Sequence, residues 1–436
     1  MYFDLPDGNV LFVNSLSGAV DLVDKTVRDK ILTENLKQEE YNYWKKRGYF
    51  FENKAAEIDA LKKVVKICKL ALFHEPLLAV IIPTYNCNLR CTYCYQRDVI
   101  NKNYNMNFKT IDLLFVAIEK LLEEKKFKKV SLLLYGGEPL LLSNKSIILK
   151  LLDEAYKRGY SIDSVITNGT TLKYWTKILS KYKVKSIQVT IDGVKKIHDK
   201  RRMFKGNKGT FDIIVEGINA SLEAGLRIAT RANIDTENVK HIHKLSDFYY
   251  KEGWFDNNNF SASYGITMNP IRGKSDLCTR DDPNTIIKIL NNIEEHWKKL
   301  YKWGFKFDRV EHIISVLTGR GSFKPKAWYC NAGKNMFVFD PMGKIYACWE
   351  NVGHDQEIGY YIPKLKFNEI ASQWAERTID NIPECWKCKM NLLCGGGCGY
   401  EAYRKFNTLM SLACHEPEAV MRIIVPFIYK HLYLKK

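Results

Sequence analysis

The sequence predicts an α/β protein built on an incomplete (β/α)6 barrel, with a small α+β domain before the barrel and a cysteine-rich region after it. Between about residue 77 and residue 270, short β-type runs alternate with longer helical patterns. One intervening segment, residues 111–122, places its apolar residues on a single helical face, as a helix packed outside a parallel sheet does. The six β-type runs are 77–84, 130–135, 164–167, 186–191, 227–234 and 260–267.

The flanking regions have patterns of their own. Residues 1–75 contain two β-like runs, 9–14 and 19–23, around Ser17 and Gly18, followed by helical stretches. We expect residues 76–282 to hold the barrel and residues 283–324 to form a helical linker with one long helix over 283–304. Residues 325–436 form the cysteine-rich region, which closes with a helix over 418–433. Because this region lacks long periodic stretches, we expect bound metal to hold it together.

Composition restricts the class of protein. The chain has 436 residues, 46% hydrophobic and 27% charged, which is typical of a globular protein with two or three domains. The N-terminus carries acids where a signal peptide needs basic residues, and no apolar run approaches the roughly 18 residues of a membrane span, so we expect a cytoplasmic protein without a membrane partner. The net charge of +18 comes from scattered lysines, which indicates a basic surface and not a nucleic-acid site. The 12 cysteines favour metal binding or redox chemistry over disulfides.

A cysteine motif follows the first β-type run, where the functional loops of such barrels lie. Cys87, Cys91 and Cys94 stand at spacings of i, i+4 and i+7, which would also place them on one face of a helix. The preceding Pro83 and two nearby asparagines instead favour a loop wrapped around a ligand. A [4Fe-4S] cluster has four irons, so three thiolates leave one iron open to another ligand.

This loop resembles the cluster loop of the radical S-adenosyl-L-methionine (SAM) superfamily, which has the form CxxxCxxC with an aromatic residue before the third cysteine. The resemblance implies that SAM binds the open iron and that reduction cleaves SAM to a 5'-deoxyadenosyl radical. Further matches are a GGEP turn after the second run, a TIDG segment after the fourth, and the segment HDKRR beyond it. An ordinary strand-ending turn, a helix cap and a surface charge are the alternative roles of these motifs. By the resemblance, the residues at the SAM site are Tyr93, Gly136, Gly137, Glu138, Thr190 and Arg202.

Seven further cysteines lie near the end of the chain, and a GGG run directly precedes one of them. They resemble the SPASM extension of radical SAM enzymes, and the resemblance then covers residues 77–416. The extension implies two auxiliary [4Fe-4S] clusters, and thus three clusters in all. A zinc ribbon is the alternative, although seven ligands fit neither one tetrahedral zinc ion nor two. The family assigns Cys385, Cys388, Cys394 and Cys414 to the distal cluster, and Cys330, Cys348 and Cys398 to the nearer one.

The nearer cluster lacks an obvious fourth ligand. Cys68 and Cys278 are the two remaining cysteines, and we expect each to be a small buried apolar residue. An open iron could then bind the thiolate of a substrate. Passing one electron to the oxidised cluster would allow a thioether to form without an external oxidant.

Relatives with a SPASM extension mostly modify peptides or proteins, which implies a precursor peptide as substrate and a flavodoxin- or ferredoxin-type electron donor. Residues 1–75 resemble, more loosely, the precursor-peptide recognition element of thioether-forming maturases of six-cysteine (SCIFF-type) and related ranthipeptides. An exposed strand there could accept the leader peptide by edge addition. A structural cap on the open barrel is the alternative. The resemblance therefore implies an oxidoreductase that crosslinks a ribosomally made peptide (RiPP) through a cysteine thioether.

Other functions stay open at this point. One is a peptide maturase that forms a carbon-carbon crosslink, and another is an enzyme similar to the anaerobic sulfatase maturases. Sulfatase maturases carry an aspartate directly after the second SPASM cysteine as a catalytic base, whereas Cys348 is followed by Trp349 and Glu350. An iron-sulfur electron carrier is the alternative that is not an enzyme, and it has no need of the GGEP and TIDG motifs. The sequence does not identify the catalytic acid or base.

Overall fold

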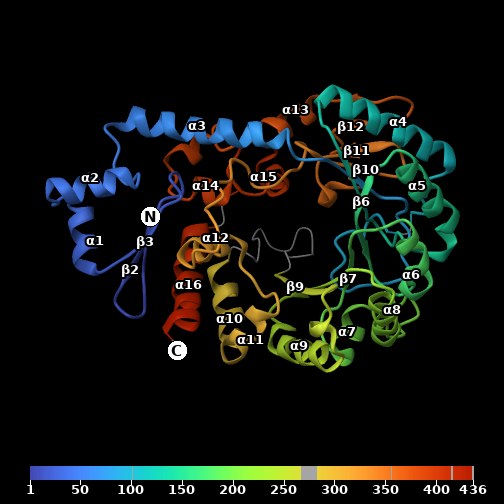
Figure 1. The fold of residues 1–436 in the computed structure, drawn as a ribbon. Helices are drawn as coiled ribbons and strands as arrows, with labels where there is room; N and C mark the ends of the chain where they lie inside the picture. The colour runs from blue at the N-terminus through green and yellow to red at the C-terminus, as the bar shows by residue number, and fades with distance from the viewer. Residues whose placement is uncertain (101, 267–281, 355, 414–415, 435–436) are drawn as a thin grey trace.

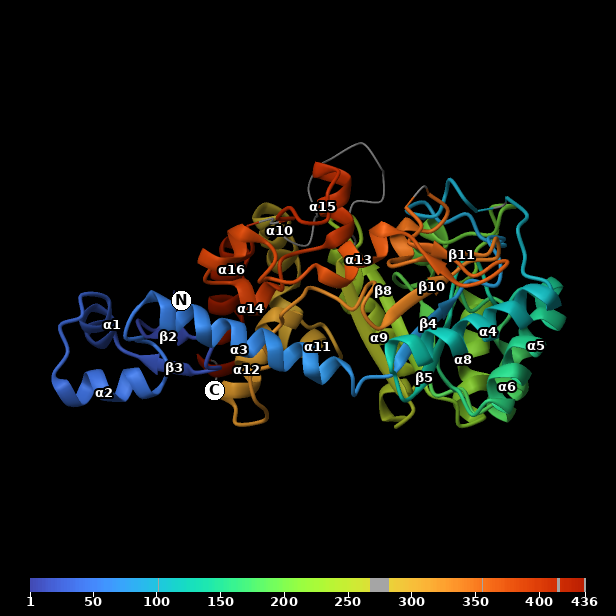
Figure 2. The same ribbon diagram turned by 90° about the horizontal axis from the view of Figure 1, so that it is seen from above.

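Three regions follow one another across the molecule in the computed structural model, which describes residues 1–100, 102–266, 282–354, 356–413 and 416–434. A small N-terminal unit lies at one end and the barrel at the other; the helices of the cysteine-rich region over 391–429 lie between them, and its strands over 336–360 lie against the barrel (Figures 1 and 2). Among the described residues, no helix combines the length and the apolar character needed to cross a membrane.

The N-terminal unit is a three-stranded antiparallel sheet with three helices. Its strands pair in the order β1-β2-β3, so β3 lies at an edge. One face of the sheet packs on α1 and α2 through residues that include Phe12, Ile31 and Trp44, whereas the other face joins the main core. The elements are β1 (Tyr2–Asp4), β2 (Val10–Val13), β3 (Val20–Val23), α1 (Lys25–Leu32), α2 (Gln38–Lys46) and α3 (Lys54–Leu72). The two predicted strands are present, and β1 was not predicted.

Helix α3 connects the N-terminal unit with the rest of the molecule. It begins at Asn53, whose side chain accepts a hydrogen bond from the Ala56 backbone NH. Leu61 and Val65 on its buried face pack against apolar side chains of the cysteine-rich region, among them Ile379. The N-terminal unit is therefore fixed to the cysteine-rich region by an apolar contact.

Six parallel strands form the barrel sheet and pair in chain order, from β4 to β9. Strand β9 lies at the edge of the sheet, so the barrel is open, and the predicted α/β class is confirmed. Residue 267, where the last predicted run ends, lies outside the described residues. The strands are β4 (Leu77–Ile81), β5 (Val130–Leu134), β6 (Ser161–Thr167), β7 (Ile187–Thr190), β8 (Ile228–Ile234) and β9 (Phe260–Ile266).

Helices cover the outside of this sheet (Figure 1). Helix α4 begins at Asn107, whose side chain accepts a hydrogen bond from the Thr110 backbone NH. Its predicted apolar face is buried, including Ile111, Leu114 and Ile118. The helices of the barrel are α4 (Phe108–Lys125), α5 (Lys145–Lys157), α6 (Leu172–Lys181), α7 (Lys195–Arg201), α8 (Phe211–Glu223) and α9 (Ile242–Lys251).

The cysteine-rich region extends the barrel sheet, which was not predicted. Strand β10 (Met336–Phe339) pairs in parallel with β4 on the side opposite β5, and Val338 lies beside Val80. All residues of β10 are buried, so this short apolar strand closes an edge that the six barrel strands would leave unpaired. The sheet continues antiparallel through β11 (Lys344–Tyr346), β12 (Gly359–Tyr360) and β13 (Lys366–Phe367).

The helices of the linker and the C-terminal region differ from the prediction in two places. A 3-10 turn at Glu294–His296 divides the expected long helix over 283–304. The closing helix ends at Tyr429 and continues as a π-helical turn over Lys430–Leu434. The helices are α10 (Pro283–Ile293), α11 (Trp297–Lys302), α12 (Asp308–Leu317), α13 (Glu369–Glu376), α14 (Asn391–Cys394), α15 (Gly399–Phe406) and α16 (Pro417–Tyr429).

Candidate functional site

The first cysteine motif lies in an irregular loop after β4, as predicted, and not on a helix. A distant segment of the chain holds this loop, because the backbone NH of Arg90 donates to the Met203 carbonyl at 2.8 Å and that of Thr92 to the Arg201 carbonyl at 2.9 Å. The buried Cys87 Sγ accepts a hydrogen bond from the Leu89 backbone NH at 3.4 Å. The two backbone contacts therefore attach the loop to the segment at the end of α7, and the third contact stabilises the loop itself.

The three thiols of this loop lie close enough to influence one another electrostatically. Burial raises the pKa of Cys87 to about 12, with further contributions from Glu138 and from the thiols of Cys91 and Cys94. Burial, then the Cys91 thiol, raises the pKa of Cys94 to about 11. Binding of a metal by these thiols would therefore release protons.

The GGEP turn packs directly against the cysteine loop. A Cβ atom at Gly137 would lie 2.3 Å from the Asn86 carbonyl oxygen, so only glycine allows this approach. The backbone NH of Glu138 also donates to that oxygen, at 2.8 Å. The two motifs that the resemblance assigned to one site are therefore adjacent in space.

Glu138 joins the ends of β5 and β6. Its carboxylate is fully buried and accepts hydrogen bonds from Thr167 Oγ1 at 2.7 Å and from the backbone NH groups of Asn168 at 2.6 Å and Leu140 at 2.9 Å. Burial raises the pKa of Glu138, and these three donors oppose the shift. Its expected contact with SAM stays a prediction, because the carboxylate already has three partners within the protein.

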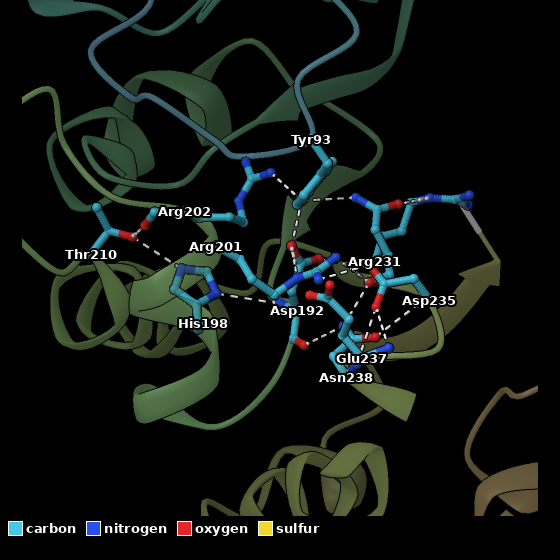
Figure 3. Close-up of polar contacts among 11 residues, drawn as sticks. Tyr93, Asp192, His198, Arg201, Arg202, Thr210, Arg231, Asp235, Glu237 and Asn238 are labelled. Atoms are coloured by element: carbon cyan, nitrogen blue, oxygen red, sulfur yellow. Dashed lines mark hydrogen bonds and ion pairs between the residues drawn. The ribbon is translucent and has the colours of Figure 1, made fainter. Parts of the chain in front are cut away.

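A buried network centred on the Tyr93 hydroxyl joins the cysteine loop to the ends of β7 and β8 (Figure 3). This hydroxyl donates to the fully buried Asp192, and it accepts from Arg202 Nη1 at 2.7 Å and Asn233 Nδ2 at 3.2 Å. The guanidinium of Arg201 lies 4.9 Å from the centre of the Tyr93 ring, with its Nε atom 3.5 Å from the Asp192 carboxylate. Tyr93 and Arg202, which were predicted together at the SAM site, are thus in direct contact.

Several members of this network were not singled out from the sequence. Asp192 and His198 lie inside the TIDG and HDKRR segments, so the motifs contained the signal, but Asn233 at the end of β8 belongs to no motif. His198 is fully buried, with Nδ1 3.3 Å from the Asp192 backbone nitrogen and Nε2 3.0 Å from Thr210 Oγ1. Burial lowers the pKa of His198 to about 3, so this imidazole is neutral and orients the turn.

Thr190, the predicted hydroxyl contact, is buried at the end of β7.

The residues around the first loop fit a bound cluster with SAM. The Arg202 guanidinium is buried beside Cys91, and within the described part of the chain its Nε atom has no hydrogen-bond partner. A buried, unsatisfied donor on a guanidinium is costly, and a carboxylate is the group that best satisfies it. The arrangement therefore suits an anionic ligand next to the three thiols.

Three cysteines of the second set lie close together in space. The thiols of Cys330, Cys348 and Cys398 influence one another, and after burial Cys398 makes the largest contribution to the raised pKa of Cys348. Cys330 lines a small, open cavity. The members of the other group, Cys385, Cys388 and Cys394, are close in sequence over η7 (Pro383–Lys387) and α14, and Cys414 lies outside the described residues. The cavity is lined by Trp328, Tyr329, Cys330, Ala332, Lys334, Trp374, Arg377, Gly397 and Gly399.

The GGG run brings the two groups together. All three glycines have positive φ, +71°, +83° and +73°, which disfavours any other residue. A Cβ atom at Gly395 would lie 2.4 Å from the Trp328 backbone, and one at Gly397 would lie 2.2 Å from the Ala413 carbonyl oxygen. The turn therefore contacts the segments that lead to Cys330 and Cys414.

Among the described residues, no three side chains of the metal-binding types converge on a point where one ion could sit. In a [4Fe-4S] cluster each thiolate binds a different iron atom, so its ligands stand further apart than those of one ion. Cys68 is half-buried on α3 with Sγ 3.6 Å from the Pro325 carbonyl oxygen and packs among apolar side chains, as expected of a small apolar residue. Cys278 lies outside the described residues.

An aromatic contact links the first cysteine loop with the second cysteine region. The hydroxyls of Tyr95 and Tyr135 share a short hydrogen bond, and the ring centres of Tyr135 and Trp349 are 5.9 Å apart. The Glu350 carboxylate contributes to the raised pKa values of both tyrosines and, after burial and Cys398, to that of Cys348. Glu350 is thus close enough to influence both tyrosines and Cys348.

Comparison with known proteins agrees with this geometry. Residues 81–249 match the family profile described as the Radical SAM superfamily. The chain is 26% identical over 331 residues to the cysteine-type anaerobic sulfatase-maturating enzyme of Clostridium novyi (strain NT), which covers 72% of this chain and 85% of the relative. It is 23% identical over 373 residues to the antilisterial bacteriocin subtilosin biosynthesis protein AlbA of Bacillus subtilis (strain 168), which covers 81% of this chain and 75% of the relative.

Two solved structures share the fold. Native anSMEcpe with bound AdoMet has a TM-score of 0.59 at 21% sequence identity and covers 81% of this chain and 97% of that chain. Streptococcus suis SuiB bound to the precursor peptide SuiA has a TM-score of 0.55 at 18% identity and covers 95% of this chain and 97% of that chain. At these identities the likeness concerns the fold.

Proposed function

We propose that this chain, whose residues 81–249 form a radical SAM domain, is a peptide maturase that crosslinks a ribosomally made precursor through a cysteine thioether. The domain implies a [4Fe-4S] cluster and SAM, for which Cys87, Cys91 and Cys94 are the proposed cluster ligands. The relatives named above support the class of function, since they include a sulfatase-maturating enzyme and a bacteriocin biosynthesis protein.

The observation that carries the choice of a thioether is the group of Cys330, Cys348 and Cys398 beside a cavity. Their thiols influence one another, and Cys330 is exposed and lines the cavity, so this group can be reached from outside the chain. When bound, the clusters and SAM supply a carbon radical by hydrogen abstraction and accept the electron that remains after the C–S bond forms. The protein's part is to hold a peptide thiol near that carbon, which makes the bond-forming step intramolecular.

The first test is the metal content of the protein. Three cubanes on ten cysteines predict about 12 irons per chain after anaerobic reconstitution, measured together with zinc by elemental analysis. Replacing Cys385 and Cys388 by alanine is expected to remove about 4 of these irons and leave the first cluster in place. About 4 irons with stoichiometric zinc in the unmodified protein would support the zinc ribbon instead.

The second test is the mass of the product. Each thioether removes two hydrogens, one as an abstracted atom and one as the thiol proton, so the modified precursor is expected to be about two mass units lighter per crosslink. Alkylating the peptide thiols before the reaction is expected to abolish this change. If the loss persists after alkylation, the bond does not involve sulfur, and a carbon-carbon crosslink becomes the better interpretation.

Strand β3 is the proposed site for the leader peptide. It lies at the edge of the three-stranded sheet, and the side chain of its Leu22 is 46% exposed. A leader that adds there as a fourth strand would gain backbone hydrogen bonds along the edge and apolar contact with Leu22. The basic surface of the chain suits an acidic leader.

Replacing Leu22 by glutamate is expected to weaken binding of the precursor about tenfold, since a charge replaces an apolar contact. Binding is measured by fluorescence anisotropy with a labelled leader. The matched control is Ile213→Glu, which alters an apolar side chain of similar exposure on α8. Equal losses in both variants would contradict a leader site on β3. Point substitution is preferable to deleting residues 1–75, because α3 covers apolar side chains of the cysteine-rich region.

A sulfatase-maturase-like activity is the second candidate, and Glu350 is the observation that favours it. This carboxylate influences both Tyr135 and Cys348, and it stands one residue later than the aspartate of the sulfatase maturases. Incubation with a cysteine-containing sulfatase peptide distinguishes the two functions, because only the second predicts an aldehyde in place of the thiol.

A further inference from the structure

Two buried cations lie beside the second set of cysteines. Arg377, which follows α13, is 5% exposed and Lys334 is 8% exposed, and both line the same cavity as Cys330. Neither residue belongs to the cysteine motifs. A buried charge costs several kcal/mol unless a counter-charge compensates it. The partners of these two side chains therefore indicate which negatively charged group the site holds.

The Arg377 guanidinium connects the loops that carry the cysteines. Its Nη1 atom donates to the carbonyls of Leu409 and, at 3.0 Å, Ser411, and its Nη2 atom donates to those of Gly396 at 2.7 Å and Gly397 at 3.3 Å. A Cβ atom at Gly396 would lie 3.8 Å from the sulfur of Cys385, and Gly397 immediately precedes Cys398. One side chain therefore positions segments from both groups of cysteines.

Lys334 is held in a similar way on the side of Cys330. Its ammonium donates to the carbonyls of Trp374 at 2.9 Å and Ala375 at 3.0 Å, near the C-terminus of α13. It also lies 5.6 Å from the centre of the Trp328 ring. Helix-end carbonyls and a ring face favour a cation, but neither supplies a full negative charge.

Within the described ranges of the chain, neither cation forms an ion pair with a carboxylate. Asp380, an acid that acts on Lys334, already pairs with Lys69 at 3.1 Å. After burial, the strongest influences on the pKa of Arg377 are thiols, those of Cys398, Cys385, Cys330 and Cys394. The thiol that influences the pKa of Lys334 is that of Cys330. Two acids do lie near the cysteines, but Glu350 influences the pKa of Cys348 and Glu401 influences the pKa of Cys398.

We propose that Arg377 and Lys334 are the built-in counter-charges of the two auxiliary clusters, with Arg377 shared by both and Lys334 serving only the cluster at Cys330, Cys348 and Cys398. This inference rests on the auxiliary clusters of the proposed function. Reduction adds a negative charge to a cluster, so a nearby cation stabilises the reduced form and raises the reduction potential. Both residues act through the clusters and are positioning residues.

The test is a redox titration of the reconstituted full-length protein, followed by EPR spectroscopy. Lys334→Met is expected to shift the potential of one auxiliary cluster to more negative values and to leave the iron content and the first cluster unchanged. Arg377→Gln is expected to shift both auxiliary clusters in the same direction, whereas Arg377→Lys, which keeps the charge, is expected to shift them less. The matched control is Lys69→Met, which removes an exposed lysine that pairs with Asp380 and is expected to shift no potential.

The inference is overturned if Lys334→Met retains its iron and all its potentials equal those of the unmodified protein, or if Lys69→Met shifts them equally. If Lys334→Met loses iron, the Lys334→Arg variant distinguishes a role for the charge from a role in packing. Recovery of the iron supports a role for the charge, and failure to recover it shows that the lysine only fills space. Zinc in place of auxiliary iron in the unmodified protein would overturn the proposed clusters themselves, and elemental analysis identifies that outcome before any titration.

Discussion

Replacing Cys87, Cys91 and Cys94 together by alanine is expected to reduce the formation of 5'-deoxyadenosine from SAM to the level of a reaction without protein. The three thiols lie in one loop and influence one another, which supports the proposal that they form a single ligand set. Without them the first cluster has no ligands at its barrel site, and reductive cleavage has no site at which to occur. The product is measured by liquid chromatography after reduction with dithionite under anaerobic conditions.

Two controls make this result specific. Cys68→Ala removes a half-buried thiol outside both motifs and is expected to retain full cleavage. The triple variant is also expected to keep about 8 irons in the auxiliary clusters. Cleavage above background in a triple variant that is folded and retains those irons would contradict the assignment of this loop.

Replacing Arg202 by leucine is expected to weaken SAM binding about 100-fold. The buried guanidinium contacts Tyr93 at 2.7 Å and lies beside Cys91, and its Nε donor has no partner among the described residues, which suits the carboxylate of SAM. Hydrogen bonds to a charged group contribute about 1.5 to 3 kcal/mol each, so losing the charge and its donors accounts for a change of this size. SAM affinity is measured by equilibrium dialysis with reconstituted protein.

The control for this variant separates binding from folding. Arg202→Lys keeps the charge and loses the planar fork, so it is expected to recover only part of the affinity. Tyr93→Phe removes the hydroxyl that holds the guanidinium and is expected to weaken binding less than Arg202→Leu does. Thermal melting identifies a variant that fails to fold. Unchanged SAM affinity in a folded Arg202→Leu variant would show that the guanidinium serves the loop and not the ligand.

Local patterns in the sequence were sufficient for the α/β class and for the loop that holds Cys87, Cys91 and Cys94, and the family resemblance predicted that Tyr93 and Arg202 belong to one site. These features depend on periodicity and on motifs at strand ends, and the ends of parallel strands meet at one edge of a sheet whatever the intervening helices are. The order of β4 to β9 in the structure agrees with that rule.

Other features required the tertiary structure. The pairing of β10 with β4 joins residues more than 250 positions apart, and nothing in either short strand specifies its partner. The network that joins Asp192 and Asn233 to Tyr93 depends in the same way on which side chains face one another across the barrel.

Arg377 illustrates the same limit. In the sequence it is one basic residue among many, and only its burial among carbonyls beside two groups of cysteines distinguishes it. The sequence by itself determined the α/β barrel, because periodicity along the chain encodes it directly, and its cysteine spacing predicted the cluster ligands and, through the family resemblance, the class of chemistry. The tertiary structure alone decided which buried charges face the cysteines, because burial and electrostatic contact arise only when distant segments pack together.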